Sequence, residues 1–305
     1  MSHSDPLPTT GAEDGVPVGV FDTSWQAGPG ISVFAPDLFR ERVAIITGGG
    51  SGLGREVAHG FARLGAHAVI AGRKADKLED VVRSVKEIGG ECTAIPTNIR
   101  DTQQVDALRD EVYERFGRAD FLVNNAGGQF PALPSAISDN GWRAVVDLNL
   151  NGTWNVTSRF MRPMAEAGFG SIVNVVTLFS FDRGAPMFLH SGAARAGVVN
   201  MAKTLAPYLM RHGVTINVLA PGIFLTEALV ESELGPLGHT EESFVEELVS
   251  QRMSARMGTV DEMAGTILYL CSPAARYVCG ATLVADGASM QGNWVSSLLP
   301  GPDEF

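Results

Sequence analysis

A chain of 305 residues with 45% hydrophobic and 19% charged residues has an ordinary globular composition and is long enough to bury a large core. Its net charge of -11 at pH 7 excludes the basic surface that nucleic-acid binding requires, and no apolar run reaches the roughly 18 residues of a membrane span. The three cysteines lack CxxC spacing and the chain starts without a leader pattern, so we expect free thiols in the cytoplasm and no metal site.

Residue composition and hydrophobic periodicity divide the chain into three parts. Residues 1–38 are rich in Gly, Pro, Ser, Thr and acidic residues without sustained periodicity, and we expect a flexible N-terminal extension. Strand and helix patterns alternate through residues 39–290, which predicts one catalytic domain followed by a tail at 291–305.

The domain begins with an apolar, β-branched run from Val43 to Thr47, which predicts a buried strand. Five glycines follow over seven positions, and a helix-period pattern then starts. A flexible linker is the alternative interpretation, but the flanking strand and helix favour a turn that binds the pyrophosphate of a dinucleotide at a helix N-terminus. The predicted contacts of this turn are Gly48, Ser51, Gly52, Leu53 and Gly54.

A second apolar run, at 66–71, predicts the next strand, and Arg73 and Lys74 follow it about 20 residues beyond the glycine turn. An acidic residue at this position would bind the ribose hydroxyl of NAD, whereas two basic residues suit the 2'-phosphate of NADP. The sequence therefore favours NADP(H) over NAD(H). The alternative is a pair of solvated basic residues at a helix start.

Further along, the apolar runs that end before Asn98, before Asn125 and before Thr177 each predict a strand. Parallel strands present their carboxyl ends at one edge of a sheet, where such sheets bind ligands. Because strands and helices alternate almost throughout, the predicted fold is α/β: a single Rossmann-type, doubly wound parallel sheet of about seven strands with helices on both faces. Residues 226–257 alternate acids with apolar anchors and predict either a helical lid over a substrate or an acidic surface helix pair.

Between residues 40 and 290 the chain resembles the short-chain dehydrogenase/reductase family. The turn Thr47–Gly54 looks like its cofactor turn, and Asn124–Gly127 looks like its Asn-Asn-Ala-Gly segment. Pro221–Thr226 is similar to its contact with the nicotinamide amide, and Asn149 matches its active-site asparagine. The resemblance implies that cofactor contacts include Asn98, Ile99, Asn125, Ala126, Gly127, Arg195, Pro221, Gly222, Ile223 and Thr226.

The family's catalytic Tyr-x-x-x-Lys is missing, because Ser191 occupies the tyrosine position and Arg195 the lysine position. A serine hydroxyl ionises too reluctantly and an arginine stays protonated, so neither is a good proton carrier. One helical turn apart, they share a helix face, and we expect Arg195 to hold the nicotinamide ribose. We expect Ser191 and Asn149 to donate hydrogen bonds to an oxygen that gains negative charge, close to Thr177 at the family's usual serine position.

Hydride addition to a carbon–carbon double bond conjugated with a thioester needs a bound nicotinamide and hydrogen-bond donors to the thioester oxygen. It depends less on a tyrosine than carbonyl reduction does. The carbonyl oxygen becomes enolate-like, and water protonates the carbon afterwards. Residues 125–130 and 190–197 resemble the peroxisomal trans-2-enoyl-CoA reductase branch. The related 2,4-dienoyl-CoA reductases also carry serine for tyrosine, but they keep lysine where Arg195 stands and a compensating tyrosine where this chain has Ser180.

The resemblance implies an NADP(H)-dependent oxidoreductase that reduces an enoyl-CoA or dienoyl-CoA thioester. Its expected partner is an acyl-CoA, with neither nucleic acid nor membrane, and its expected assembly is a homodimer or homotetramer. The last residues, Pro302 to Phe305, differ from a peroxisomal tripeptide.

Three alternatives stay open at this point. His190 is a second candidate for the proton donor, because an unperturbed histidine titrates near neutrality. An alcohol or ketone dehydrogenase of the citronellol type shares the His-Ser-Gly-Ala-Ala-Arg segment that starts at His190. A nucleotide-binding protein without turnover would explain the missing tyrosine.

Overall fold

The computed structural model describes residues 33–224 and 257–289 and, between these ranges, the single positions 226, 229, 234, 235, 238, 240 and 243. The predictions for the N-terminal extension before residue 33, for most of the lid at 226–257 and for the tail at 291–305 lie outside the described residues.

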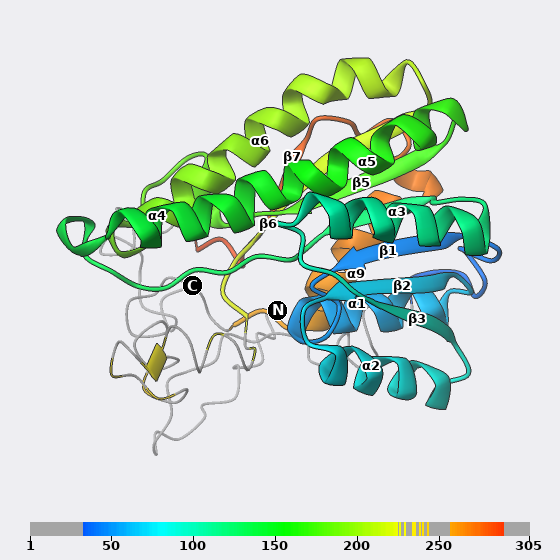
Figure 1. Ribbon diagram of the computed structural model, residues 1–305, viewed down its shortest axis with the longest axis horizontal. Helices are drawn as coiled ribbons and strands as arrows, with labels where there is room; N and C mark the ends of the chain where they lie inside the picture. The colour runs from blue at the N-terminus through cyan, green and yellow to red at the C-terminus, as the bar shows by residue number, and fades with distance from the viewer. Residues whose placement is uncertain are drawn as a thin grey trace, which may run out of the picture.

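In the described part of the chain, seven parallel strands form one sheet in the order β3-β2-β1-β4-β5-β6-β7 (Figure 1). In the register, Val43 pairs with His67 on one side of β1, and Ala44 pairs with Phe121 on the other. The strands are β1 (Val43–Thr47), β2 (His67–Gly72), β3 (Glu91–Pro96), β4 (Phe121–Asn124), β5 (Gly170–Val175), β6 (Val214–Pro221) and β7 (Thr282–Ala285).

The central strands are apolar runs rather than alternating patterns because both faces of a parallel sheet are covered. All five residues of β1 and all eight residues of β6 are buried. Strand β3 is an edge strand, and only Ile95 of its six residues is buried.

Helices cover both faces of the sheet (Figure 1). Successive side chains of a strand point to opposite faces. Ala44 and Ile46 of β1 therefore pack against α1, α2 and α9, and Val43 and Ile45 pack in the core below α3, α5 and α6. The helices are α1 (Gly52–Arg63), α2 (Ala75–Glu87), α3 (Thr102–Phe116), α4 (Asp139–Val146), α5 (Gly152–Glu166), α6 (Leu189–Met210) and α9 (Val260–Cys271). The predicted doubly wound α/β fold is confirmed.

From β1, strands β2 and β3 continue the sheet on one side, and strands β4 to β7 continue it on the other. The strand order therefore reverses direction between β1 and β4. In open parallel sheets a ligand binds in the crevice outside the carboxyl ends of the strands at such a reversal. The glycine turn after β1 and the Asn125–Gly127 segment after β4 therefore meet at one edge of the sheet.

Candidate cofactor and active site

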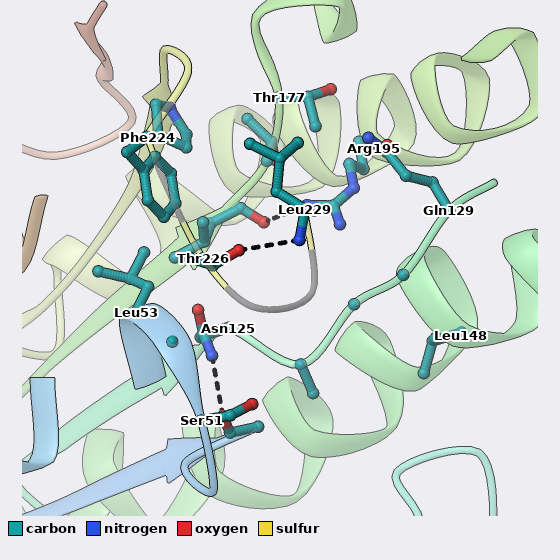
Figure 2. A pocket seen from close by; sticks show the side chains of 18 of the residues that line it. Ser51, Leu53, Asn125, Gln129, Leu148, Thr177, Arg195, Phe224, Thr226 and Leu229 are labelled. Carbon is teal, nitrogen blue, oxygen red and sulfur yellow. Dashed lines mark hydrogen bonds between the residues drawn. The ribbon is translucent and has the colours of Figure 1, made fainter. Parts of the chain in front are cut away.

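A cavity of about 810 Å³ opens at the carboxyl ends of the strands, and Figure 2 shows side chains of its wall. Thr177, Arg195 and Gln129 lie toward one end of this view, and Ser51 and Asn125 toward the other. Every predicted cofactor residue except Gly54 lines the cavity: Gly48, Ser51, Gly52, Leu53, Arg73, Lys74, Asn98, Ile99, Asn125, Ala126, Gly127, Arg195, Pro221, Gly222, Ile223 and Thr226. Of the predicted catalytic residues, Thr177 and Arg195 line it, whereas Asn149, His190 and Ser191 lie behind its wall.

The turn after β1 forms a cradle that requires glycine. Gly48 has a φ of 68°, and a Cβ at this position would lie 2.9 Å from the Cα of Ala126. Gly54 lies behind the wall, where a Cβ would collide with the carbonyl oxygen of Gly48, so α1 packs directly against the turn. Helix α1 starts at Gly52 with no side-chain cap and no acidic residue in its first turn. Its first N–H groups are therefore available to an anion in the cavity.

Two side chains fasten the glycine turn to the end of β4. The Oγ1 of Thr47 accepts the N–H groups of Asn125 at 3.1 Å and of Ala126 at 3.0 Å. The Nδ2 of Asn125 donates to the carbonyl oxygens of Thr47 at 3.1 Å and Gly48 at 3.3 Å. The predicted cofactor contact Asn125 thus lines the cavity and also fixes the shape of the turn.

Three basic residues line the cavity beyond the end of β2: Arg73, Lys74 and Lys77. Arg73 and Lys74 are exposed, whereas Lys77 is half-buried in the first turn of α2. Lys77 follows Lys74 by three residues, so the two side chains share one helix face. This spacing could have identified Lys77 as a site residue from the sequence. No aspartate or glutamate lines the cavity among the residues that the structure describes.

Arg195 projects from α6 into the cavity and is only 9% exposed. Its Nη1 donates to the carbonyl oxygen of Val175 at 3.1 Å, which fixes the guanidinium at the end of β5. Gly127 packs against this group, because a Cβ at Gly127 would collide with the Nη2 of Arg195. The guanidinium is therefore held in a fixed position on the cavity wall.

The side chain of Asn149 makes hydrogen bonds that the sequence did not predict. It lies in a π-helical stretch, Asp147–Asn151, between α4 and α5. Its Nδ2 donates to the carbonyl oxygens of Gly128 and Val145, each at 2.8 Å, and its Oδ1 accepts the Gly128 N–H at 3.2 Å. A side-chain amide has two hydrogens, and both are used here. Asn149 therefore holds the Gly128 backbone in place, and its predicted role as a donor to a substrate oxygen stays a prediction.

Ser191 is fully buried, and its Oγ donates to the Oε1 of Gln129 at 2.6 Å. Gln129 itself lines the cavity. The hydroxyl predicted to reach a substrate therefore holds the glutamine that does line the cavity. Gln129 follows directly after the Asn-Asn-Ala-Gly-Gly run at the carboxyl end of β4, and that position is the signal that could have pointed to it.

His190 is also fully buried, and its ring packs edge-on against Phe130 with 4.4 Å between the ring centroids. Burial lowers the pKa of His190, because desolvation disfavours the charged imidazolium. A neutral imidazole behind the cavity wall does not suit a proton donor at neutral pH, so this alternative is not supported.

Thr177 lines the cavity, and its Oγ1 lies 2.8 Å from the Oγ of Ser180. Ser180 is 3% exposed and also accepts the N–H of Thr177 at 3.3 Å. None of the four tyrosines of the chain lines the cavity, so no other tyrosine takes the place of the one that the family motif would supply.

The glycine turn after β1 and the uncapped N-terminus of α1 suit one anionic group, and the basic residues after β2 suit a second. Together they form a site for an extended ligand with an anionic group at each place. A doubly wound parallel sheet with this site at its point of reversal defines a protein of the dinucleotide-binding class. In the described part of the chain, no group of three or more His, Cys, Asp or Glu is arranged to hold a metal ion.

Comparison with known proteins identifies the family within this class. The family model for short chain dehydrogenases matches residues 42–235. The peroxisomal 2,4-dienoyl-CoA reductase of Mus musculus is 37% identical over 259 residues, which cover 84% of this chain and 86% of that protein. The chain belongs to the short-chain dehydrogenase family, and the protein is an oxidoreductase. The similarity to 2,4-dienoyl-CoA reductases confirms the predicted branch.

Solved structures agree with this assignment. The citronellol catabolism dehydrogenase of Pseudomonas aeruginosa PAO1 is 36% identical, with a TM-score of 0.71 over 84% of this chain and 98% of its own. A variant of actinorhodin polyketide ketoreductase, determined with NADPH, is 28% identical, with a TM-score of 0.77 over 84% of this chain and 99% of its own. The family and these structures support a nicotinamide cofactor.

Proposed function

We propose that the protein uses NADPH to reduce a carbon–carbon double bond conjugated with the thioester of an acyl-CoA, either 2,4-dienoyl or 2-enoyl. The observation that carries the proposal is the replacement of the family's tyrosine by a buried serine that holds Gln129 at the cavity wall. The amide of Gln129 can donate a hydrogen bond to the thioester oxygen of a substrate, but it cannot transfer a proton to that oxygen. The 37% identity to a 2,4-dienoyl-CoA reductase supports the same class of substrate.

The residues of the cavity fit the cofactor. The uncapped N-terminus of α1 would hold the pyrophosphate, and the cations beyond β2 would hold a 2'-phosphate, which favours NADP(H) over NAD(H). Arg195 would hold the nicotinamide ribose, and the Pro221–Thr226 segment would contact the amide. When bound, NADPH supplies the hydride.

The chain's own contribution to the reaction is to stabilise charge on the thioester oxygen. Gln129 carries an amide donor, Thr177 carries a hydroxyl, and Arg195 brings a positive charge to the same cavity. Fixed donors of this kind stabilise an enolate-like oxygen without giving it a proton. Ser191 and Ser180 position Gln129 and Thr177, respectively, and water protonates the carbon.

A second candidate is an alcohol dehydrogenase, because the citronellol catabolism dehydrogenase is similar in sequence and structure. Alcohol oxidation requires a group that accepts the hydroxyl proton. Among the described residues that line the cavity there is no tyrosine, histidine, aspartate or glutamate. Reduction of NADP⁺ by citronellol would nevertheless establish this activity.

The test is NADPH consumption with trans-2-enoyl-CoA and 2,4-dienoyl-CoA thioesters of graded chain length. We expect turnover of at least one series. NADPH binding without oxidation by any thioester would contradict the proposal and support binding without turnover.

Two variants test the site assignment in the same assay. We expect Arg195→Ala to raise the KM for NADPH about tenfold or more, because it removes a charged contact to the cofactor. We expect Ser191→Ala to lower kcat by about tenfold, because Gln129 loses its anchor. Ser158→Ala is the matched control, since this serine bonds within α5 to the Asn155 carbonyl oxygen. Unchanged kinetics in both site variants would refute the assignment.

Assembly and location are further parts of the proposal. Exposed large apolar side chains on α5 and α6, namely Trp154, Tyr208 and Met210, support a homodimer or homotetramer. No described helix is long and apolar enough to cross a membrane. A cytoplasmic location stays a prediction, and the peroxisomal relative makes the peroxisome its alternative.

A further inference from the structure

All charged residues that line the cavity in the described part of the chain are basic, although the protein as a whole is acidic. Five basic residues and no acidic residue line it within the described part of the chain, in a protein with a net charge of -11. A cleft lined by one sign of charge attracts ligands of the other sign. The five residues are Arg73, Lys74, Lys77, Arg183 and Arg195.

The proposed function assigns four of these cations to the cofactor. Arg73, Lys74 and Lys77 lie at the end of β2, where the 2'-phosphate would bind, and Arg195 is fastened to the Val175 carbonyl oxygen inside the cavity. Arg183 lies in the loop between β5 and α6. Three strand spacings separate β2 from β5 in the sheet, which corresponds to about 14 Å. Arg183 therefore lies at the opposite end of the cavity from the 2'-phosphate cluster.

Arg183 is placed to receive an anion from a ligand. It is half-buried, and it makes no ion pair or hydrogen bond with any described residue, including its acidic neighbour Asp182. An arginine in a cavity wall without a carboxylate partner suits a phosphate, which it binds through two parallel N–H donors.

Two contacts on either side of Arg183 in the sequence fasten the loop that carries it. The rings of Phe179 and Phe188 stack with 5.6 Å between their centroids, which joins the start of the loop to its end. The carbonyl oxygen of Met187 accepts the N–H of Ala132 at 2.9 Å, which joins the loop to the segment after β4. These contacts hold both ends of the loop beside the cavity.

We infer that Arg183 binds a phosphate group of the coenzyme A part of the substrate. The inference rests on the proposed function and adds the residue that distinguishes a CoA thioester from an uncharged thioester. The phosphates of the dinucleotide are assigned to the other end of the cavity, so the anion at Arg183 comes from the second ligand.

The test compares two thioesters of the same 2,4-dienoyl acid, one of coenzyme A and one of pantetheine, which lacks phosphate. We expect Arg183→Ala to raise the KM for the CoA thioester about tenfold, with kcat and the Kd of NADPH unchanged. The KM for the pantetheine thioester should stay the same. Arg183→Lys should recover part of the loss, because it keeps the charge but loses the paired donors.

Arg211→Ala is the matched control, because it removes the same charge from an exposed position at the far end of α6. The wild-type KM for the CoA thioester should also rise with salt more steeply than that of Arg183→Ala. An equal effect on both thioesters, no effect, or weaker NADPH binding in Arg183→Ala would overturn the inference. If the wild-type protein reduces neither thioester, the proposed function fails and the inference fails with it. If the wild type reduces both with equal KM, only the inference fails.

Discussion

Single residues of the site divide into those that line the cavity and those that hold them in place. Thr177 and Arg195 line it, whereas Ser191 and Asn149 lie behind its wall and hold Gln129 and Gly128, which line it. The sequence motifs identified these four residues, Thr177, Arg195, Ser191 and Asn149, as candidates for the active site. They did not predict the hydrogen-bond partners, because Ser191 and Gln129 are 62 residues apart and meet only in the fold.

The preference between cofactors is a property of the cations after β2. We expect Arg73→Ala to raise the KM for NADPH by about ten- to a hundredfold and to leave the KM for NADH almost unchanged, because only NADPH carries the 2'-phosphate. Steady-state kinetics with both cofactors measure this. Arg83→Ala is the control, since it removes the same charge from the exposed face of α2. A parallel change for both cofactors would mean that Arg73 does not select NADP(H).

Among the elements, the π-helical stretch at Asp147–Asn151 is the one whose geometry is tied to the site. Wider turns of this kind often occur at functional sites within helices. Here Asn149, at the centre of the stretch, is 3% exposed and bonds to both the N–H and the carbonyl oxygen of Gly128. It thereby positions Gly127, which packs against Arg195.

We expect Asn149→Ala to lower the free energy of unfolding by about 1–3 kcal/mol, because it removes three hydrogen bonds to the backbone of half-buried Gly128 and buried Val145. It should also lower kcat, because the wall beside Arg195 is no longer fixed. Urea denaturation and steady-state kinetics test both effects.

Asn151→Ala is the control, because Asn151 is exposed and bonds to the exposed Asp147 in the same stretch. It should change the free energy of unfolding by less than about 0.5 kcal/mol. A large loss of kcat in Asn149→Ala with unchanged stability would support the predicted role of Asn149 as a donor to the substrate.

For the whole molecule, the alternation of apolar runs with helical patterns was sufficient to predict the doubly wound sheet and the edge at which ligands bind. Buried strands are specified by local composition, and the glycine turn by steric limits at Gly48 and Gly54. Gln129, Lys77 and Arg183 were not predicted as site residues. Their importance depends on which side chains reach the cavity, and this is decided by loops and by packing between distant segments.

The distribution of charge is likewise visible only in the folded molecule. A net charge of -11 in the sequence gives no indication of an anionic ligand, yet the described part of the cavity wall carries only basic charges. Two polyanions, a dinucleotide and a CoA thioester, suit such a wall. The proposed function therefore requires hydride transfer between these two ligands inside this cavity.

The most direct measurement is mass spectrometry of the product formed from 2,4-dienoyl-CoA and NADPH that carries deuterium at the transferable position of the nicotinamide. We predict one deuterium in the product, bound to a carbon of the formerly conjugated system and retained in water, with much less product from Ser191→Ala. A reduced product without deuterium, or labelled NADPH that is never consumed, would contradict the account.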